Sequence, residues 1–148
     1  MKIGDPHDLY RFVAAQDSGG TYQRAAAELR KGRKASHWMW FIFPQIAGLG
    51  YSPASQTYAI SGLEEARAYL AHPVLGARLI ECAAIVAGVS GRTAEQIFGA
   101  TDAMKLRSSM TLFHRAAPGD PLFAAVLDRC FGGVVDERTD ALLEHLAR

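Results

Sequence analysis

The chain has 148 residues, of which 49% are hydrophobic and 21% charged, and its 16 basic and 15 acidic side chains leave a net charge of +1. This length is typical of one globular domain, and the composition excludes the disordered, collagen-like and low-complexity classes. The near-zero net charge argues against nucleic acid and against an anionic membrane as partners, because no overall field would steer the chain to either.

Start signals for helices recur along the chain. A proline follows a residue that can precede a helix at Asp5-Pro6, Ser52-Pro53, His72-Pro73 and Asp120-Pro121, and the aspartates and the serine among these residues are strong N-caps. Capping-box spacings occur at Ser61 with Glu64 and at Thr93 with Gln96. Glycines at 19–20, 32, 88, 99 and 132–133 are expected to end helices.

Between these signals, apolar residues recur at spacings of three and four. In chain order they predict helices around residues 9–13, 22–29, 75–89, 106–113, 123–130 and 142–146, and no clear period-two alternation indicates a sheet. We therefore predict an all-α single domain over residues 1–148, with seven to nine short helices around one core spanning about 5–143. Cys82 and Cys130 fall on apolar stripes and are expected to be reduced core residues.

The amino terminus lacks the apolar stretch of a signal peptide, and no apolar run approaches the ~18 residues of a membrane span. We therefore expect a cytoplasmic protein. The histidines, cysteines and carboxylates show no metal-ligand spacing, and the chain contains no dinucleotide or Walker motif. Neither a metal nor a cofactor is expected.

The most distinctive segment runs from Arg33 to Gln45 and contains both tryptophans. We predict a helix over 37–43, capped by Ser36 and ending near Pro44, rather than a strand, because a lone strand would have no partner for its backbone. Residues spaced by two point about 200° apart on a helix, so one of the two tryptophans is expected to line a surface or a pocket. A loop with two glycines, Gly48 and Gly50, follows.

A second distinctive segment, residues 101–114, places Lys105, Ser108 and Ser109 on one helix face. One cation and two hydroxyls on one face could hold an anionic group such as phosphate, although a solvated polar face is the simpler interpretation. Asp102 lies in the first turn of the same helix and is a candidate general acid or base.

These two segments form our predicted site for a small anionic or nucleotide-like ligand. The binding residues would be Ser36, His37, Trp38, Trp40, Phe43, Gln45, Lys105, Ser108 and Ser109, and His37 or Asp102 could transfer protons. Two alternatives stay open. The aromatic segment could simply be a central buried helix, or it could form an exposed patch that docks a protein partner or a second copy in a homodimer.

The stretch from Thr21 to Ser36 is locally basic, since Glu28 is its one acidic residue among five lysines and arginines. Such a tract beside aromatic residues could contact a nucleic acid, but the net charge of the chain argues against a large footprint. A small anionic ligand would need one or two of these cations.

Four stretches of the sequence carry a family resemblance: Asp5-Pro6-His7-Asp8-Leu9, Gly32-Arg33-Lys34 with Ser36 to Gln45, Ile97-Phe98-Gly99, and Lys105-Leu106 with Ser108 to Phe113. On these residues the chain closely resembles the domain-of-unknown-function 1810 family, from about Asp5 to Leu143. The resemblance implies a compact all-helical domain and lends no catalytic residue.

Some members of that family carry the label calpastatin. An inhibitor of that kind resembles a disordered repeat, whereas this chain has a core-forming pattern throughout. In the order of its features, the aromatic segment followed by Ser52, Ser55 and Tyr58 and then by Lys105, the chain is also similar to the helical NADAR N-glycosidases. That similarity implies an enzyme acting on ADP-ribosyl groups, so whether the chain is an enzyme stays open at this point.

Overall fold

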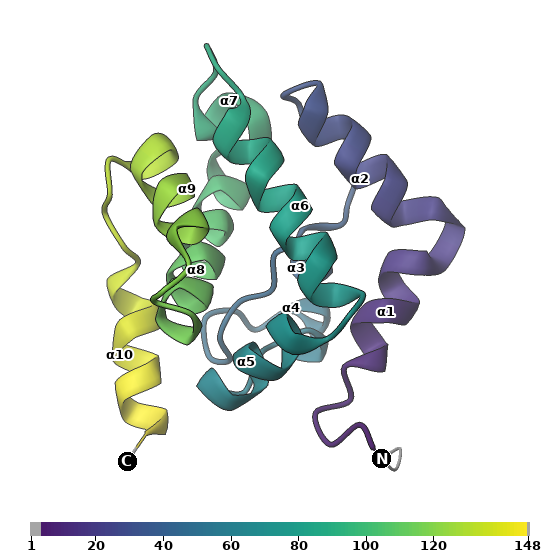
Figure 1. The fold of residues 1–148 in the computed structure, drawn as a ribbon, viewed down its shortest axis with the longest axis vertical. Coiled ribbons are helices and arrows are strands. Elements are labelled where there is room, and N and C mark those ends of the chain that lie inside the picture. Colours follow the sequence, from purple (N-terminus) through teal and green to yellow (C-terminus); the bar gives the residue numbers. More distant parts are fainter. Residues whose placement is uncertain (1–3, 148) are drawn as a thin grey trace.

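The computed structural model describes residues 4–147, and it is helical throughout its regular elements (Figure 1). The elements are α1 (Tyr10–Asp17), the short 3-10 turn η1 (Ser18–Gly20), α2 (Thr21–Arg30), α3 (Met39–Ile42), α4 (Pro53–Thr57), α5 (Leu63–Ala71), α6 (Leu75–Gly88), α7 (Ala94–Phe98), α8 (Ala100–Ala116), α9 (Pro121–Phe131) and α10 (Glu137–Leu146). The predicted all-α single domain is confirmed.

The longest helix, α8, is the centre of the packing. It contacts α5, α7, α9 and α10, while α6 packs on α2, α5 and α9. Six consecutive residues of α8, Ser108 to Phe113, are buried, so the helix is covered around its whole circumference at that level. The central buried helix is therefore α8, although Trp38, Met39, Ile42 and Phe43 of the aromatic segment are buried in the core as well.

Several predicted helix starts are confirmed by the local hydrogen bonds. Ser52 caps α4 and Asp120 caps α9, each before a proline, and Thr93 with Gln96 forms a complete capping box at α7. The predicted box at Ser61 is wrong, because its hydroxyl and backbone N–H both donate to the Glu65 carboxylate, so Glu64 takes no part. In that turn the N-cap position falls one residue later, on a glycine.

The helix after Pro73 begins at Leu75, one turn after His72, whose Nδ1 accepts hydrogen bonds from the backbone N–H groups of Val74 and Leu75. At this corner α5 and α6 are bent by 91°. An added Cβ on Gly76 would lie 2.1 Å from the Leu70 carbonyl oxygen, so this close approach requires glycine.

Among the described residues, no single helix is both long and apolar enough to cross a membrane, and the pair α5 and α6 meets the length and composition criteria only as a bent unit. Both cysteines are free thiols, as expected: Cys82 is fully buried, and Cys130 is half-buried against the core. Burial raises the pKa of the Cys82 thiol to about 12, so this thiol is protonated at neutral pH.

Candidate functional site

The segment between α2 and α3 is held by one carboxylate. Oε1 of Glu28 accepts hydrogen bonds from the backbone N–H groups of Ala35 and Ser36 at 2.7 and 3.0 Å and from Nε1 of Trp38 at 2.9 Å, and its Oε2 accepts the Ser36 hydroxyl at 2.6 Å. Burial raises the pKa of Glu28, but these donors outweigh it and hold the pKa at about 2.

These bonds explain why the helix predicted over 37–43 is wrong at its start. The Ser36 hydroxyl donates to Glu28 and does not cap a helix, and regular helix begins only at Met39 and ends at Ile42. The side chains that donate to Glu28 are those of Ser36 and Trp38, eight and ten positions further along the chain. A prediction of Ser36 as an N-cap from the local sequence cannot detect a partner at that distance.

The segment meets the first turns of α8 through a cluster of three charges. Nζ of Lys34 lies 2.8 Å from Oδ2 of Asp102, and Nζ of Lys105 lies 3.5 Å from Oδ1 of the same carboxylate. The two cations also lie over indole rings: Lys34 Nζ is 5.0 Å from the ring centroid of Trp38, and Lys105 Nζ is 5.0 Å from that of Trp40. The structure thus brings the two predicted segments together.

The two tryptophans have different environments, as their spacing predicted. Trp38 is fully buried and packs against Phe43 and Phe98, with ring centroids 6.4 and 6.5 Å away. Trp40 is half-buried and lines a cavity. Because Trp38 and Phe43 are both inaccessible, neither can stack on a ligand, and the segment does not present them as an exposed docking patch.

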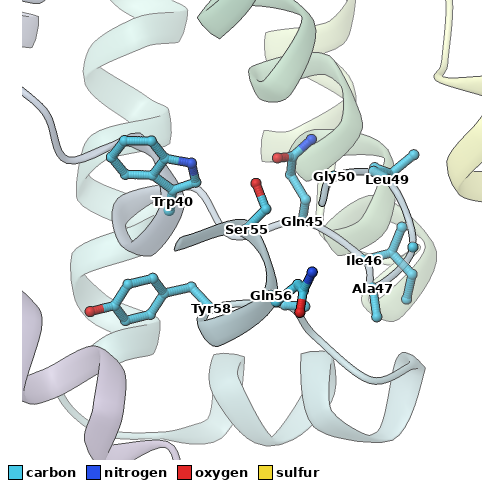
Figure 2. Close-up of a pocket in the computed structure, with 11 residues that line it drawn as sticks. Trp40, Gln45, Ile46, Ala47, Leu49, Gly50, Ser55, Gln56 and Tyr58 are labelled. Carbon is cyan, nitrogen blue, oxygen red and sulfur yellow. The ribbon is translucent and has the colours of Figure 1, made fainter. Parts of the chain in front are cut away.

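The cavity has a volume of about 160 Å³ and lies between Trp40 and the loop that follows it (Figure 2). Its lining residues are Trp40, Gln45, Ile46, Ala47, Gly48, Leu49, Gly50, Ser55, Gln56, Tyr58 and Ala59. The loop is closed at its base by a parallel bridge between Ile46 and Ile60, in which the N–H of Ile60 donates to the Gln45 carbonyl and the N–H of Ala47 to the Ile60 carbonyl, both at 2.8 Å.

The two glycines of this loop have specific steric roles. Gly48 has a φ of +102°, a region that side-chain-bearing residues rarely adopt, and Leu142 of α10 packs against it. A Cβ on Gly50 would lie 2.7 Å from the Ser55 hydroxyl oxygen, so the absence of a side chain lets α4 approach the loop. Gly50 therefore sets the distance between the two walls of the cavity, whereas Gly48 lets α10 pack against the loop.

Trp40, Gln45 and Ser55 each bring a polar group to the wall of this cavity. Figure 2 shows the indole nitrogen of Trp40 on the side of the ring that faces Ser55 and Gln45, whereas the Tyr58 hydroxyl points away. Within the described residues, neither the Trp40 nitrogen nor the Gln45 carboxamide has a hydrogen-bond partner, and neither is fully enclosed. Both groups are available to a ligand.

The two serines of α8 do not form the polar face that was predicted. The Ser108 hydroxyl is buried and donates to Oδ2 of Asp136 at 2.8 Å, where it helps to fix the first turn of α10. The Ser109 hydroxyl oxygen is also buried and has no hydrogen-bond partner among the described residues. Both lie on the contact side of a helix that is surrounded by other helices, so the interpretation as a solvated face is wrong, and Ser108 is not free to hold an anion.

The remaining predicted residues lie outside the cavity wall. His37 is exposed, while Ser36, Lys105 and Asp102 are partly buried and do not line the cavity. No cluster of three or more histidine, cysteine or carboxylate side chains suited to a metal occurs among residues 4–147. Of the predicted binding residues, the cavity is lined by Trp40 and Gln45.

Comparison with known proteins agrees with this fold. A family model described as "Protein of unknown function (DUF1810)" matches residues 6–143. The chain belongs to this family. The resemblance seen in the sequence motifs is thus confirmed, and the match covers both walls of the cavity.

A solved structure, that of the conserved hypothetical protein Rv1873 from Mycobacterium tuberculosis, is similar to this DUF1810 chain. The two are 54% identical, and they superpose with a TM-score of 0.91 over 95% of this chain and 99% of the other. No curated protein matches the chain.

Sequence reasoning missed the second wall of this DUF1810 cavity as a binding surface. Ser55 and Tyr58 come from α4 and the turn after it, and both face the loop only because the bridge at Ile46 and Ile60 folds the chain back. The available signals were the glycine pair at 48 and 50, which indicated a close backbone approach, and the similarity in feature order that had singled out Ser55 and Tyr58.

Proposed function

We propose that the protein binds a small nucleotide-like ligand, with a single-ring base in the cavity beside Trp40 and an anionic group near Lys105. The observation that carries this proposal is the cavity itself, which joins an indole wall to a glycine loop and has unpaired polar groups at its edge. Aromatic walls with a few fixed polar groups are typical of small-molecule sites.

The volume of the cavity limits the size of what it can enclose. A cavity of roughly 150 Å³ holds one benzene-sized ring, and this one is about 160 Å³. A pyrimidine or nicotinamide ring matches that volume, whereas the two fused rings of a purine exceed it. The rest of a nucleotide would have to lie outside the cavity.

The polar groups favour a ring with an amide-type edge. The Gln45 carboxamide can donate and accept at once, and the Trp40 nitrogen is a donor. Pyrimidines and nicotinamide carry neighbouring donors and acceptors that can pair with such groups. Ser55 adds a hydroxyl from the opposite wall, and this hydroxyl accepts a hydrogen bond from Ser52 at 2.8 Å.

Lys105 is the cation best placed for an anionic substituent. Its Nζ lies 5.0 Å from the Trp40 ring centroid and 3.5 Å from Asp102, a longer contact than the 2.8 Å pair between Asp102 and Lys34. Lys34 neutralises the carboxylate in the tighter pair, so Lys105 keeps charge to offer a phosphate.

Binding is favoured over catalysis because the cavity wall consists of aromatic, aliphatic, amide and hydroxyl groups. An N-glycosidase acting on ADP-ribosyl groups would need a carboxylate or another proton-transferring group at the bond that breaks. Asp102 is the candidate, since it contacts the lysine that lies over Trp40. Hydrolysis of an ADP-ribosyl ligand is therefore the second candidate activity. We also propose that the protein is located in the cytoplasm, which cell fractionation would test.

The test compares the binding of several ligands to the original protein and to a variant that lacks the Lys105 charge. Calorimetry would measure the dissociation constants of uridine, UMP, nicotinamide mononucleotide and AMP with the original protein and with Lys105→Met. We expect the single-ring nucleotides to bind more tightly than AMP. Lys105→Met should weaken UMP about tenfold, which is about 1.4 kcal/mol, and leave uridine unchanged.

Two further variants separate the cavity from general effects. Trp40→Leu should abolish binding of both uridine and UMP, and Tyr51→Leu is the matched control, because Tyr51 is 86% exposed and does not line the cavity. If no ligand binds, or if Trp40→Leu binds as well as the original protein, the proposal is wrong. Hydrolysis that releases nicotinamide from NAD or nicotinamide mononucleotide, lost in Asp102→Asn, would favour the enzyme instead.

A further inference from the structure

A second hollow lies at the carboxyl end of α2, and the Glu28 side chain forms part of its wall. It has a volume of about 760 Å³ and is lined by Arg24, Ala27, Glu28, Lys31, Arg33, Lys34 and Ala35. Trp40 and the glycine loop take no part in it, so it is separate from the cavity beside Trp40.

Three of its four cations have little or nothing to neutralise them. Lys34 is paired with Asp102, but Lys31 and Arg33 are exposed and their side chains have no partner among the described residues. Arg24 makes two long hydrogen bonds of 3.3 Å, to the Gly19 carbonyl and to the Thr21 hydroxyl, and no ion pair within residues 4–147.

The single carboxylate of the hollow is already occupied. Both oxygens of Glu28 accept hydrogen bonds from the segment that leads to α3, four in all. Glu28 keeps its negative charge and supports the wall of the hollow, but within the described residues it forms no ion pair with Arg24, Lys31 or Arg33. Cations at a helix carboxyl end also offset the helix dipole, but Lys31 and Arg33 lie beyond Arg30, the last residue of α2.

The basic surface continues around the end of the helix. Lys31 also lines a neighbouring hollow with Arg30 and Arg92, between the carboxyl ends of α2 and α6, and Figure 1 shows both ends at the same end of the molecule. Arg30 is balanced by Glu81 at 3.8 Å. The concentration of unneutralised charge is thus greatest at Arg24, Lys31 and Arg33.

We propose that this hollow binds a small ligand that carries two adjacent phosphate groups. A terminal diphosphate has about three negative charges near neutral pH, which matches three cations around one hollow. None of the large apolar side chains exposed elsewhere on the described chain lies in the hollow. A nucleic acid strand would need a longer basic track and an aromatic stacking platform, so a small ligand is favoured.

The test measures inorganic pyrophosphate binding by calorimetry in magnesium-free buffer at low and at moderate salt. We expect pyrophosphate to bind about tenfold more tightly than inorganic phosphate and to weaken as salt rises. The double variant Lys31→Ala with Arg33→Ala should weaken pyrophosphate at least about tenfold. The control is Arg67→Ala with Arg138→Ala, which removes the same charge from exposed positions outside the hollow.

Each outcome decides the proposal. Loss of pyrophosphate binding in the first double variant alone, with an unchanged circular dichroism spectrum, supports it. Equal weakening in both double variants overturns it, because the binding would then follow net charge. No effect in either variant also overturns it, because Lys31 and Arg33 would then not contact the ligand. A twelve-residue oligothymidylate that binds more tightly than pyrophosphate and loses affinity in the same variant would replace the small ligand by nucleic acid. Trp40→Leu should leave pyrophosphate binding unchanged, so this site is tested independently of the other.

Discussion

Replacing Glu28 by alanine should destabilise the protein far more than a surface substitution does, because four donors lose their acceptor. Trp38 is fully buried, so its Nε1 would be left without a partner, which costs about 1–3 kcal/mol. Two backbone N–H groups and the Ser36 hydroxyl would lose a charged acceptor as well, although water can reach part of this half-buried site. We expect a total loss of about 3 kcal/mol in the free energy of unfolding.

Glu28→Gln is the matched variant. The amide oxygen can keep the bonds from Ala35, Ser36 and Trp38, and its NH2 group can donate to the Ser36 hydroxyl, so the geometry is retained and only the charge is lost. The shift in pKa from 4.5 to about 2 corresponds to about 3 kcal/mol before solvent screening. For a half-exposed carboxylate we take about half of that, so Glu28→Gln should cost roughly 1.5 kcal/mol.

The pH dependence has a definite sign. The folded-state pKa is lowered, so this contribution is present above about pH 5 and is lost as the pH falls toward about 2. Urea unfolding followed by circular dichroism at pH 7 and pH 3 measures it. Thermal unfolding at pH 7 is a second measurement. The expected loss of about 3 kcal/mol in Glu28→Ala corresponds to a fall of about 6–12 °C in its melting temperature.

The original protein should lose more stability between pH 7 and pH 3 than Glu28→Gln does. Equal stability of Glu28→Ala and the original protein at pH 7, or the same loss with pH in Glu28→Gln, would refute the role of this carboxylate.

Four other substitutions test the packing around α8 and at the corner of α5 and α6. Gly76→Ala should cost about 3 kcal/mol by urea unfolding, because its Cβ would lie 2.1 Å from the Leu70 carbonyl oxygen, and wild-type stability would contradict the close approach. Ser108→Ala should cost about 2 kcal/mol, since it removes a buried bond to the Asp136 carboxylate, whereas Ser109→Ala should stabilise by about 1 kcal/mol by removing an unpaired buried hydroxyl. The opposite order in thermal unfolding would show that these hydroxyls are wrongly assigned. Hydrogen bonds from Thr139 and Ser108 outweigh the effect of burial and hold the pKa of Asp136 below its usual value, so Asp136→Asn should lower stability at pH 7 and reduce its loss as the pH falls below 4.

The fold class and the starts of α4, α7 and α9 could be predicted because their causes are local. The caps at Ser52, Thr93 and Asp120 each bind a backbone group two or three residues away, so the sequence spacing alone specifies them. The same reasoning failed at Ser61, where the partner was the glutamate four residues on rather than three.

For the candidate site, the sequence by itself indicated that Trp38 and Trp40 would face different environments, and it singled out the aromatic segment and the helix of Lys105 without showing that they meet. Only the tertiary structure decided which tryptophan is accessible, that the Ser108 hydroxyl donates to the Asp136 carboxylate, and where the second wall of the cavity lies. The physical reason is that these features depend on contacts between residues distant in the chain. A periodic pattern shows that a helix has a buried side, but a helix surrounded by neighbours, as α8 is, buries its polar positions too.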